Sequence, residues 1–191
     1  MHKAAHTARL FCALFLLFRL MCTHFRTNLI TQRKQALKMG TIRPETLCQV
    51  ALVVKDVEKT AKEYAELFGV PVPEFTQVPD ETIAHTQYRG TPSATKAKIA
   101  VFHLGQVVLE LTQPDGEPSS WKEFLETNGE GVHHIAFMTN DREPVVQYFA
   151  QKGAPIRHYG EYPGGNYTVF DTKDSFKVLI QVKYKPDGNQ I

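Results

Sequence analysis

The feature that most constrains this chain is an internal repeat with an offset of 85 residues. Residues 49–58 read QVALVVKDVE and residues 134–143 read HIAFMTNDRE, and the two segments match in apolar pattern throughout. Three paired positions are identical: Ala51 and Ala136, Asp56 and Asp141, Glu58 and Glu143. Each segment reads as an apolar strand followed by an aspartate that suits the N-cap of a helix. A fixed internal period predicts two copies of one structural unit.

The two copies extend beyond these segments. Residues 106–112 (QVVLELT) and 177–183 (KVLIQVK) also match in pattern and are expected to form the last strand of each copy. Between its first and last strands, each copy has an amphipathic helix and room for two strands separated by glycine turns. The sequence therefore predicts an α+β fold of two βαβββ modules in tandem, with a curled mixed sheet around a cavity and the helices outside. The expected boundaries are a paired domain at 46–184, modules at about 46–113 and 131–184, a linker helix at about 119–128, and an inner strand at His85–Tyr88.

Charge is distributed unevenly along the chain. The formal net charge is +2, but residues 1–38 contain seven Lys or Arg and no Asp or Glu. Residues 39–191 hold 15 basic and 20 acidic residues, so this part of the chain is mildly acidic. An acidic globular region argues against a nucleic-acid-binding protein.

Residues 1–38 are expected to lie outside the fold, as a leader or as a spurious extension with translation starting at Met39. Their apolar run, Leu10–Phe18, is shorter than the ~20 residues that span a membrane. It has the length of a signal-peptide core without a cleavage site of small residues, while arginine without acid is typical of mitochondrial presequences. The three cysteines show no disulfide or metal spacing. We therefore expect a cytoplasmic domain off the membrane, with export or organelle import as alternatives.

Four polar residues interrupt otherwise apolar strands, and the repeat relates them in pairs. Gln49 pairs with His134 in the first strands, and Glu110 pairs with Gln181 in the last strands. Pseudo-twofold packing would bring the four together, and one imidazole, one carboxylate and two amide oxygens could bind a divalent metal ion. Such an oxygen-rich set favours Mn²⁺, Co²⁺, Ni²⁺ or Mg²⁺ over Zn²⁺. Taken singly, each residue is equally well explained by solvent exposure or by hydrogen bonds to its neighbours.

The other histidines give weaker signals. His133 reads as the outward-facing neighbour of His134, because successive side chains of a strand alternate between its faces. His85 and His158 are interpreted as ordinary polar residues of strands. His103 is also a strand residue, although it could line the cavity.

Longer motifs carry a resemblance to a known family. Residues 49–69 (QVALVVKDVEKTAKEYAELFG) combine a strand, an aspartate and a helix, and a second strand contains Leu109-Glu110-Leu111. A serine-containing helix at 119–129 then leads into Gly131–Ala136 (GVHHIA). On these motifs the chain resembles the vicinal oxygen chelate superfamily, or glyoxalase/bleomycin-resistance/dioxygenase fold, over about residues 46–184. Within the superfamily, it is most similar to the methylmalonyl-CoA epimerases.

The resemblance implies which residues bind the metal and which residue moves a proton. The ligand positions of the family fall on Gln49, Glu110, His134 and Gln181. Epimerases have His at the first of these positions and Glu at the last, so Gln49 and Gln181 depart from their pattern. Because an amide cannot accept a proton at neutral pH, Gln181 cannot act as the base, and Glu110 becomes the predicted catalytic residue, with His103 or His85 as alternative bases if they face the cavity.

The function implied by the resemblance is a metal-dependent isomerase or lyase. It would transfer a proton on the carbon next to a metal-bound carbonyl, as methylmalonyl-CoA epimerase does, with an acyl-CoA or a thiol adduct as the small-molecule substrate. Two alternatives remain open: a lactoylglutathione lyase similar to glyoxalase I, and a drug-sequestering member of the superfamily without catalysis. Members of the superfamily are often dimers, so the resemblance also suggests a homodimer.

Overall fold

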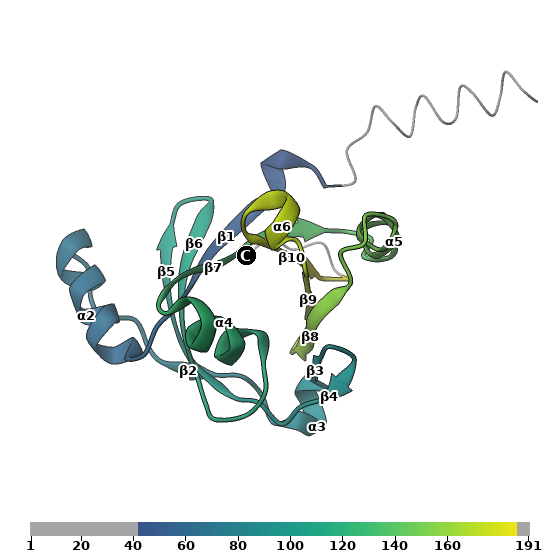
Figure 1. Ribbon diagram of the computed structural model, residues 1–191. Helices are drawn as coiled ribbons and strands as arrows, with labels where there is room; N and C mark the ends of the chain where they lie inside the picture. The colour runs from purple at the N-terminus through teal and green to yellow at the C-terminus, as the bar shows by residue number, and fades with distance from the viewer. Residues whose placement is uncertain (1–41, 187–191) are drawn as a thin grey trace, which may run out of the picture. The chain divides into compact units, whose positions relative to one another are not determined.

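The computed structural model describes residues 42–186, and the segment 1–38 assigned above to a leader lies outside this range. The described chain forms one mixed sheet of ten strands in the order β2-β5-β6-β1-β7-β10-β9-β8-β3-β4. The sheet curls into a half-barrel (Figure 1), which confirms the expected α+β fold class. The strands are β1 (Leu47–Val53), β2 (Thr76–Gln77), β3 (Gln87–Tyr88), β4 (Thr91–Pro92), β5 (Ala97–Leu104), β6 (Val107–Pro114), β7 (Gly131–Thr139), β8 (Ile156–Tyr162), β9 (Gly165–Phe170) and β10 (Leu179–Tyr184).

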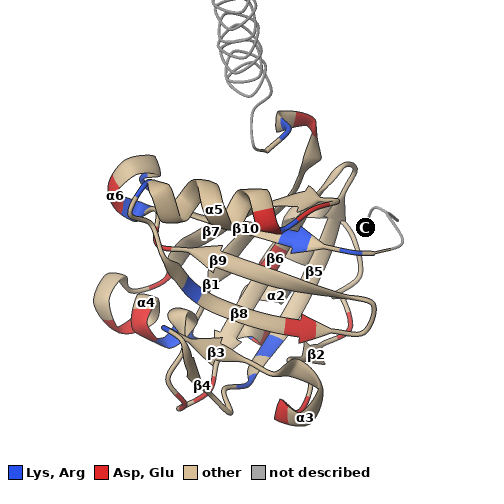
Figure 2. Ribbon diagram, turned by 90° about the vertical axis from the view of Figure 1, so that its right-hand side faces the viewer, with Lys and Arg blue, Asp and Glu red and all other residues tan. Residues whose placement is uncertain are grey.

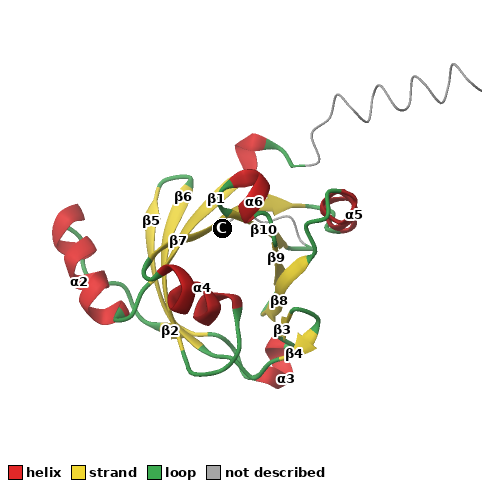
Figure 3. Cartoon of the chain, in the orientation of Figure 1, coloured by secondary structure: helices red, strands yellow, loops and turns green. Residues whose placement is uncertain are grey.

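The helices cover the outside and one open end of the curled sheet. They are η1 (Pro44–Thr46), α2 (Val57–Phe68), α3 (Glu81–Ala84), α4 (Ser120–Asn128), α5 (Glu143–Gln151) and α6 (Lys173–Phe176). Helices α2 and α5 lie outside the sheet, one on each half, and α4 lies at one open end (Figure 3). Within residues 42–186, every helix is too short or too polar to cross a bilayer.

The centre of the sheet is where the two halves meet. Strand β1 pairs in parallel with β6 and antiparallel with β7, and β7 pairs in parallel with β10. Ala51 lies opposite Glu110 on one side and His134 on the other, while Gln49 and Gln181 both lie opposite Ala136. Residues directly opposite one another share a sheet face. The inner face of these four strands therefore receives polar residues from both halves.

Each half packs its outer helix against its own strands. Helix α2 buries Val57, Ala61 and Ala65 in a cluster completed by Val54, Ala100, Phe102, Leu109 and Leu111. Helix α5 buries Val145 and Phe149 in a second cluster, completed by Ala154, Phe170, Ile180 and Val182. These apolar clusters occupy the outer face of the sheet, whereas the inner face carries polar residues together with a third apolar cluster that includes Val53, Ala97 and Trp121.

The two repeat-related aspartates begin their helices differently. Asp56 is the N-cap of α2, and its side chain accepts a hydrogen bond from the Lys59 amide at 2.9 Å. The N-cap of α5 is Arg142, which makes no side-chain capping bond. Asp141 lies one residue earlier and accepts from the Glu143 amide at 3.2 Å. The expectation that Asp141 would also be an N-cap is therefore wrong, because the turn before α5 is one residue longer.

The inner strand expected at His85–Tyr88 is shorter and lies elsewhere in the sheet. The Asp80 side chain caps α3, and His85 ends this helix in the left-handed conformation with φ of 40°. Only Gln87 and Tyr88 remain extended, and they pair with β8 of the other half instead of with β5. The two-residue strand β2 takes the place beside β5. The first half therefore contributes strands to both outer edges of the sheet.

Candidate functional site

A cavity of about 320 Å³ opens on the inner face of the sheet. Both halves line it: Glu110 comes from β6, and Gln181 and Lys183 come from β10. Trp121 of α4 and Tyr167 of β9 form further parts of the wall. The volume lies at the lower end of the range typical of small-molecule sites.

Helix α4 places two side chains toward this interior. The Ser119 hydroxyl caps the helix by accepting a hydrogen bond from the Lys122 amide at 3.1 Å. This cap fixes the first turn, so that Ser120 and Trp121 are both buried, with exposed fractions of 0% and 4%. The Trp121 ring packs on the His158 imidazole, with a distance of 4.3 Å between centroids. The linker helix is thereby part of the site as well as a connection.

The structure places the four residues selected from the sequence on the inner face of four neighbouring strands. Gln49 and His134 are buried, and the Nε2 atoms of their side chains lie 3.1 Å apart. Glu110 and Gln181 line the cavity. The Thr112 hydroxyl donates to Glu110 Oε1 at 3.1 Å. The function of these residues as metal ligands stays a prediction.

Lys183 belongs to the same cluster, and sequence reasoning missed it. Its ammonium donates a hydrogen bond to Gln49 Oε1. Lys183 is the one Lys or Arg of β10, and Figure 2 shows the colour of a basic residue on this strand. Burial raises the pKa of the Cys48 thiol on β1. The charge of Lys183 lowers this pKa and the charge of Glu110 raises it, so both charges lie near β1. Lys183 follows Gln181 by two residues, and a strand period of two would have placed both on one face.

A chain of hydrogen bonds runs from Gln49 into the protein. His134 Nδ1 lies 2.8 Å from His133 Nδ1, and His133 Nε2 lies 3.2 Å from the carbonyl oxygen of Ser120. A carbonyl only accepts, so His133 Nε2 carries the proton and His133 Nδ1 accepts from His134. His134 Nε2 then accepts from the Gln49 amide, whose oxygen accepts from Lys183. The donors and acceptors from Lys183 to the Ser120 carbonyl are thereby all assigned without conflict.

Burial keeps the histidines in this region neutral. Loss of solvation lowers the pKa values of His133 and His158 to about 3. The pKa of His134 is well below its ordinary value, first through burial and then through the nearby His133 and Lys183. The expectations that His133 faces outward and that His158 is an ordinary strand residue are wrong, since their exposed fractions are 1% and 0%. His158 Nδ1 instead lies 2.8 Å from Ser120 Oγ.

Two further histidines lie away from the buried chain. His103 is exposed and does not line the cavity, contrary to the role left open for it. His85 Nδ1 lies 3.0 Å from Glu161 Oε2, and the Tyr159 hydroxyl donates to Glu161 Oε1 at 2.8 Å. These hydrogen bonds lower the pKa of Glu161, a second carboxylate on the cavity wall that sequence reasoning did not select.

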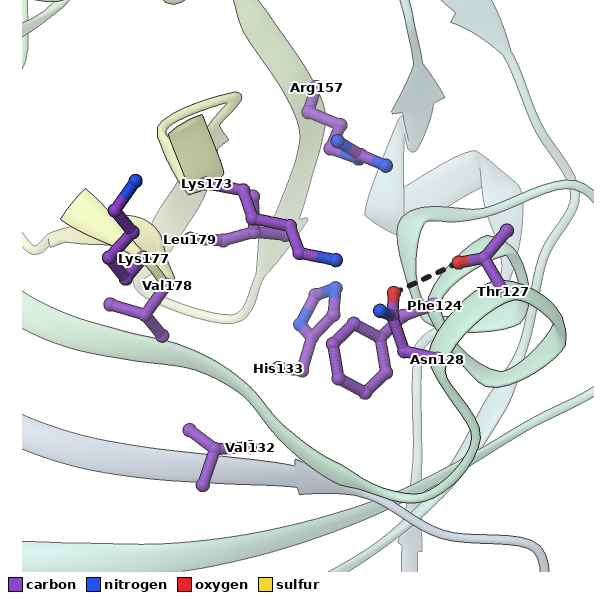
Figure 4. Close-up of a pocket in the computed structure, with 10 residues that line it drawn as sticks. All are labelled: Phe124, Thr127, Asn128, Val132, His133, Arg157, Lys173, Lys177, Val178 and Leu179. Atoms are coloured by element: carbon purple, nitrogen blue, oxygen red, sulfur yellow. Dashed lines mark hydrogen bonds between the residues drawn. The ribbon is translucent and has the colours of Figure 1, made fainter. Parts of the chain in front are cut away.

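A smaller hollow of about 80 Å³ includes His133 in its wall (Figure 4). Figure 4 shows the imidazole beside Phe124, with ring centroids 5.3 Å apart, and the Lys173 ammonium lies 6.0 Å from the centroid of the Phe124 ring. Arg157 also lines this hollow, and its guanidinium forms ion pairs of 2.7 Å with Glu123 and Asp171. The hollow is therefore too small for a typical ligand, and its arginine already has two partners.

The donor atoms around Gln49 do not fit a divalent metal ion in this arrangement. The amide oxygen of Gln49 accepts from an ammonium group, and the lone pair of His134 Nε2 accepts from the Gln49 amide. Glu110 is the one carboxylate in the set, and Lys183 lines the same cavity. Across residues 42–186, no three His, Cys, Asp or Glu side chains are grouped as metal ligands. A divalent ion would need both of these lone pairs and would lie beside a positive charge.

The fold and the cavity define a class of protein, and comparison with known families gives the same class. The family model of the Glyoxalase/Bleomycin resistance protein/Dioxygenase superfamily matches residues 48–170, which is more than half of the chain. The chain belongs to this superfamily.

Particular relatives include one without an established function and several epimerases. The chain is 42% identical over 106 residues to the uncharacterized protein YqjC of Bacillus subtilis, covering 54% of this chain and 75% of YqjC. It is 27% identical over 107 residues to the mitochondrial methylmalonyl-CoA epimerase of Homo sapiens, covering 56% of this chain but only 53% of the human protein. A solved methylmalonyl-CoA epimerase in complex with methylmalonyl-CoA and NH₄⁺ has a TM-score of 0.52 at 23% identity, covering 73% of this chain and 94% of the other. At this identity the structural likeness concerns the fold.

Proposed function

We propose that this chain is an isomerase that moves a proton on the carbon next to a carbonyl, with an acyl-CoA of the methylmalonyl type as substrate. The observation that carries the proposal is the position of Glu110. This carboxylate lies on the cavity wall at the junction of the two halves. Its Oε1 atom is held by Thr112, and its Oε2 atom has no hydrogen-bond partner among residues 42–186. The similarity to the human epimerase supports the choice of substrate.

Glu110 acts as the base in this proposal. The carboxylate takes the α-proton, and the electron pair of the C–H bond moves toward the carbonyl oxygen to form an enolate. Return of a proton to the opposite face of the carbon inverts the centre. Tyr167 is the proposed donor for that step, because this residue lines the cavity and burial raises its pKa, which keeps the hydroxyl protonated.

Proton exchange in D₂O tests the proposal directly. The full chain is incubated with methylmalonyl-CoA, and loss of the α-hydrogen signal is followed by ¹H NMR. We expect exchange well above the buffer rate, and we expect Glu110→Gln to remove most of it because an amide is not a base. Glu117→Gln is the matched control, since Glu117 is an exposed carboxylate away from the cavity. Exchange no faster than in buffer would overturn the proposal.

A non-catalytic binding protein is the second candidate, and one residue favours it. Gln181 occupies the position where the resemblance implies a carboxylate in the epimerases. If the cavity only binds ligands, calorimetric titration will show binding of methylmalonyl-CoA without exchange. A lyase similar to glyoxalase I uses the same α-proton chemistry on a different substrate. It is distinguished by turnover of the thiol adduct of methylglyoxal in place of the acyl-CoA.

A further inference from the structure

We infer that the ammonium of Lys183 occupies the position in the cavity where a divalent cation would lie, and that it binds the carbonyl oxygen of the substrate in place of a metal ion. The second clause rests on the proposed function. The first clause rests on the contacts of Lys183 alone and can be tested separately.

The hydrogen bonds of Gln49 place this cation. The Lys183 ammonium donates to Gln49 Oε1, and the Gln49 amide lies 3.1 Å from His134 Nε2. Two of the four donor atoms selected from the sequence are thus satisfied by a cation and by each other. Neither atom is a buried polar group without a partner. The Lys183 ammonium thus supplies the positive charge beside Gln49 and His134.

The repeat shows that this charge is particular to one half. Because Glu110 corresponds to Gln181, Lys183 corresponds to Thr112. The Thr112 hydroxyl donates to Glu110, and the Lys183 ammonium donates to Gln49. Both residues therefore support a cavity-facing polar group from equivalent positions, but only Lys183 brings a positive charge. A divalent ion bound next to Gln49 would be repelled by the positive charge of Lys183.

Space for a ligand lies between the two opposite charges. Lys183 and Glu110 both line the cavity, yet they form no ion pair within 4 Å in the described part of the chain. An ammonium has three N–H donors, of which one goes to Gln49. The other two are available to oxygen atoms of a ligand that enters the cavity. A carbonyl or carboxylate oxygen is the matching group, because it accepts hydrogen bonds and is favoured by a compact positive charge.

The chemical step then balances without a metal ion. The α-proton passes to Glu110, the C–H electron pair forms a carbon–carbon double bond, and the carbonyl π electrons move to oxygen. The negative charge that develops on this oxygen lies against the Lys183 N–H groups. A donor held in place before the reaction stabilises such a charge, and removing one such donor typically slows catalysis about 100- to 1,000-fold. Return of a proton to carbon restores the carbonyl.

Binding of Mn²⁺ to the full chain tests the position of the cation. Free Mn²⁺ is measured by electron paramagnetic resonance during titration of the chelator-treated protein. We expect the wild-type chain to exclude Mn²⁺, and Lys183→Met, which keeps an apolar stem of similar length, to bind about one ion per chain through Glu110 and His134. Lys183→Gln is the second neutral variant in case the first does not fold. Equal Mn²⁺ binding in wild type and in the neutral variant, or exclusion by both, would overturn the inference.

Proton exchange of methylmalonyl-CoA tests the chemical part. We expect chelator treatment to leave wild-type exchange unchanged and Lys183→Met to lower kcat about 100-fold or more. Lys183→Arg, which keeps the positive charge, is expected to retain more activity than Lys183→Met and to exclude Mn²⁺. Lys55→Met is the matched control, because Lys55 is exposed and remote from the cavity. Loss of exchange on chelation, restored by Mn²⁺, would contradict the assignment.

The two measurements separate the inference from the proposed function. If no substrate exchange is found with any variant, the proposed function fails, while the Mn²⁺ comparison of wild type and Lys183→Met still decides where the cation lies. If exchange occurs but requires Mn²⁺, the proposed function stands and the inference is wrong.

Discussion

The two halves of the cavity are built on equivalent strand positions and carry different charged groups. The first half presents a carboxylate, Glu110, and supports it with the hydroxyl of Thr112. The second half presents an ammonium, Lys183, which donates to Gln49, together with the Glu161 carboxylate, which His85 and Tyr159 hold. Duplication of the fold thus supplies matching strand positions, and divergence of the side chains gives each half its own polar groups. A substrate carbonyl can be oriented by such an unequal arrangement, whereas two identical halves would offer no direction.

The largest expected effect is the loss of the Glu110 carboxylate from the first half. Glu110→Gln should lower proton exchange about 1,000-fold, because general base catalysis contributes roughly 100- to 10,000-fold. Gln181→Ala, at the repeat-related position, should lower it only about 10-fold or less, as expected for one lost hydrogen bond. The ¹H NMR exchange assay measures both. Similar losses at the two positions would show that the halves share the catalytic work, contrary to the comparison.

The apolar clusters behind the two halves should also differ in stability. Phe149 is 2% exposed and stacks on Phe170 with ring centroids 4.4 Å apart. Phe102 is nearly as buried, but its neighbour Phe68 is 38% exposed. We expect Phe149→Ala to lower the free energy of unfolding by about 4 kcal/mol and Phe102→Ala by about 3 kcal/mol, because water can reach the cavity left in the first half. Urea unfolding measures both values, and the reverse order would contradict this reason.

The buried histidines should make the second half sensitive to acid. The folded-state pKa of His158 is about 3 against an ordinary value of 6.5, so below pH 6.5 the unfolded chain binds a proton that the folded chain does not. Stability is therefore full above pH 6.5 and falls on acidification, by at most about 1.4 kcal/mol per pH unit for this residue.

Unfolding in urea at pH 7, 6 and 5 checks this dependence. His158→Gln should reduce the slope by about one proton, even though the loss of the bond to Ser120 lowers stability at pH 7. His103→Gln, at an exposed position, should leave the slope unchanged. An unaltered slope in His158→Gln would mean that this imidazole is protonated in the folded protein.

The smallest predicted difference concerns the starts of the two outer helices. Asp56→Ala should lower the free energy of unfolding by about 1 kcal/mol, because it removes the side-chain cap of α2. Asp141→Ala should lower it by about 0.5 kcal/mol or less, since Asp141 precedes the N-cap and its bond to the Glu143 amide is longer. Thermal unfolding of the two variants gives the comparison. Equal losses would mean that both aspartates cap their helices.

Much of the fold could be predicted because the repeat is carried by local patterns. Apolar strands, amphipathic helices and glycine turns occur in the same order in both halves, and the α+β class with a curled sheet follows from them. The pairing of β3, from the first half, with β8 of the second half could not be predicted in this way. It depends on pairing between Gln87 and Tyr159, more than 70 residues apart, and on a short helix capped by Asp80. Local pattern does not determine such distant partners.

The candidate site could be predicted only in part from the sequence, for a similar reason. Gln49, Glu110, His134 and Gln181 could be selected because a polar residue is unexpected in an apolar strand. Lys183 lies where its strand becomes polar, so it reads as a solvated residue. The orientation of a long side chain depends on the partner it finds, and the Gln49 oxygen comes from a strand 134 residues away. The burial of His133 likewise depends on contacts with α4, the Phe124 ring and the Ser120 carbonyl, which the alternation of a single strand does not reveal.

The outermost strands of the sheet have a consequence for assembly. The outermost strand at each edge has two residues, Thr76–Gln77 in β2 and Thr91–Pro92 in β4, and a proline has no N–H to offer a further strand. Long unpaired edges invite other chains to extend the sheet, and short edges interrupted by proline discourage this. At β2 and β4, an added strand would therefore find few backbone groups to bond. Beyond β2, residues 100–104 of β5 pair with β6 alone among the described strands, so this stretch of β5 is where a further strand could extend the sheet.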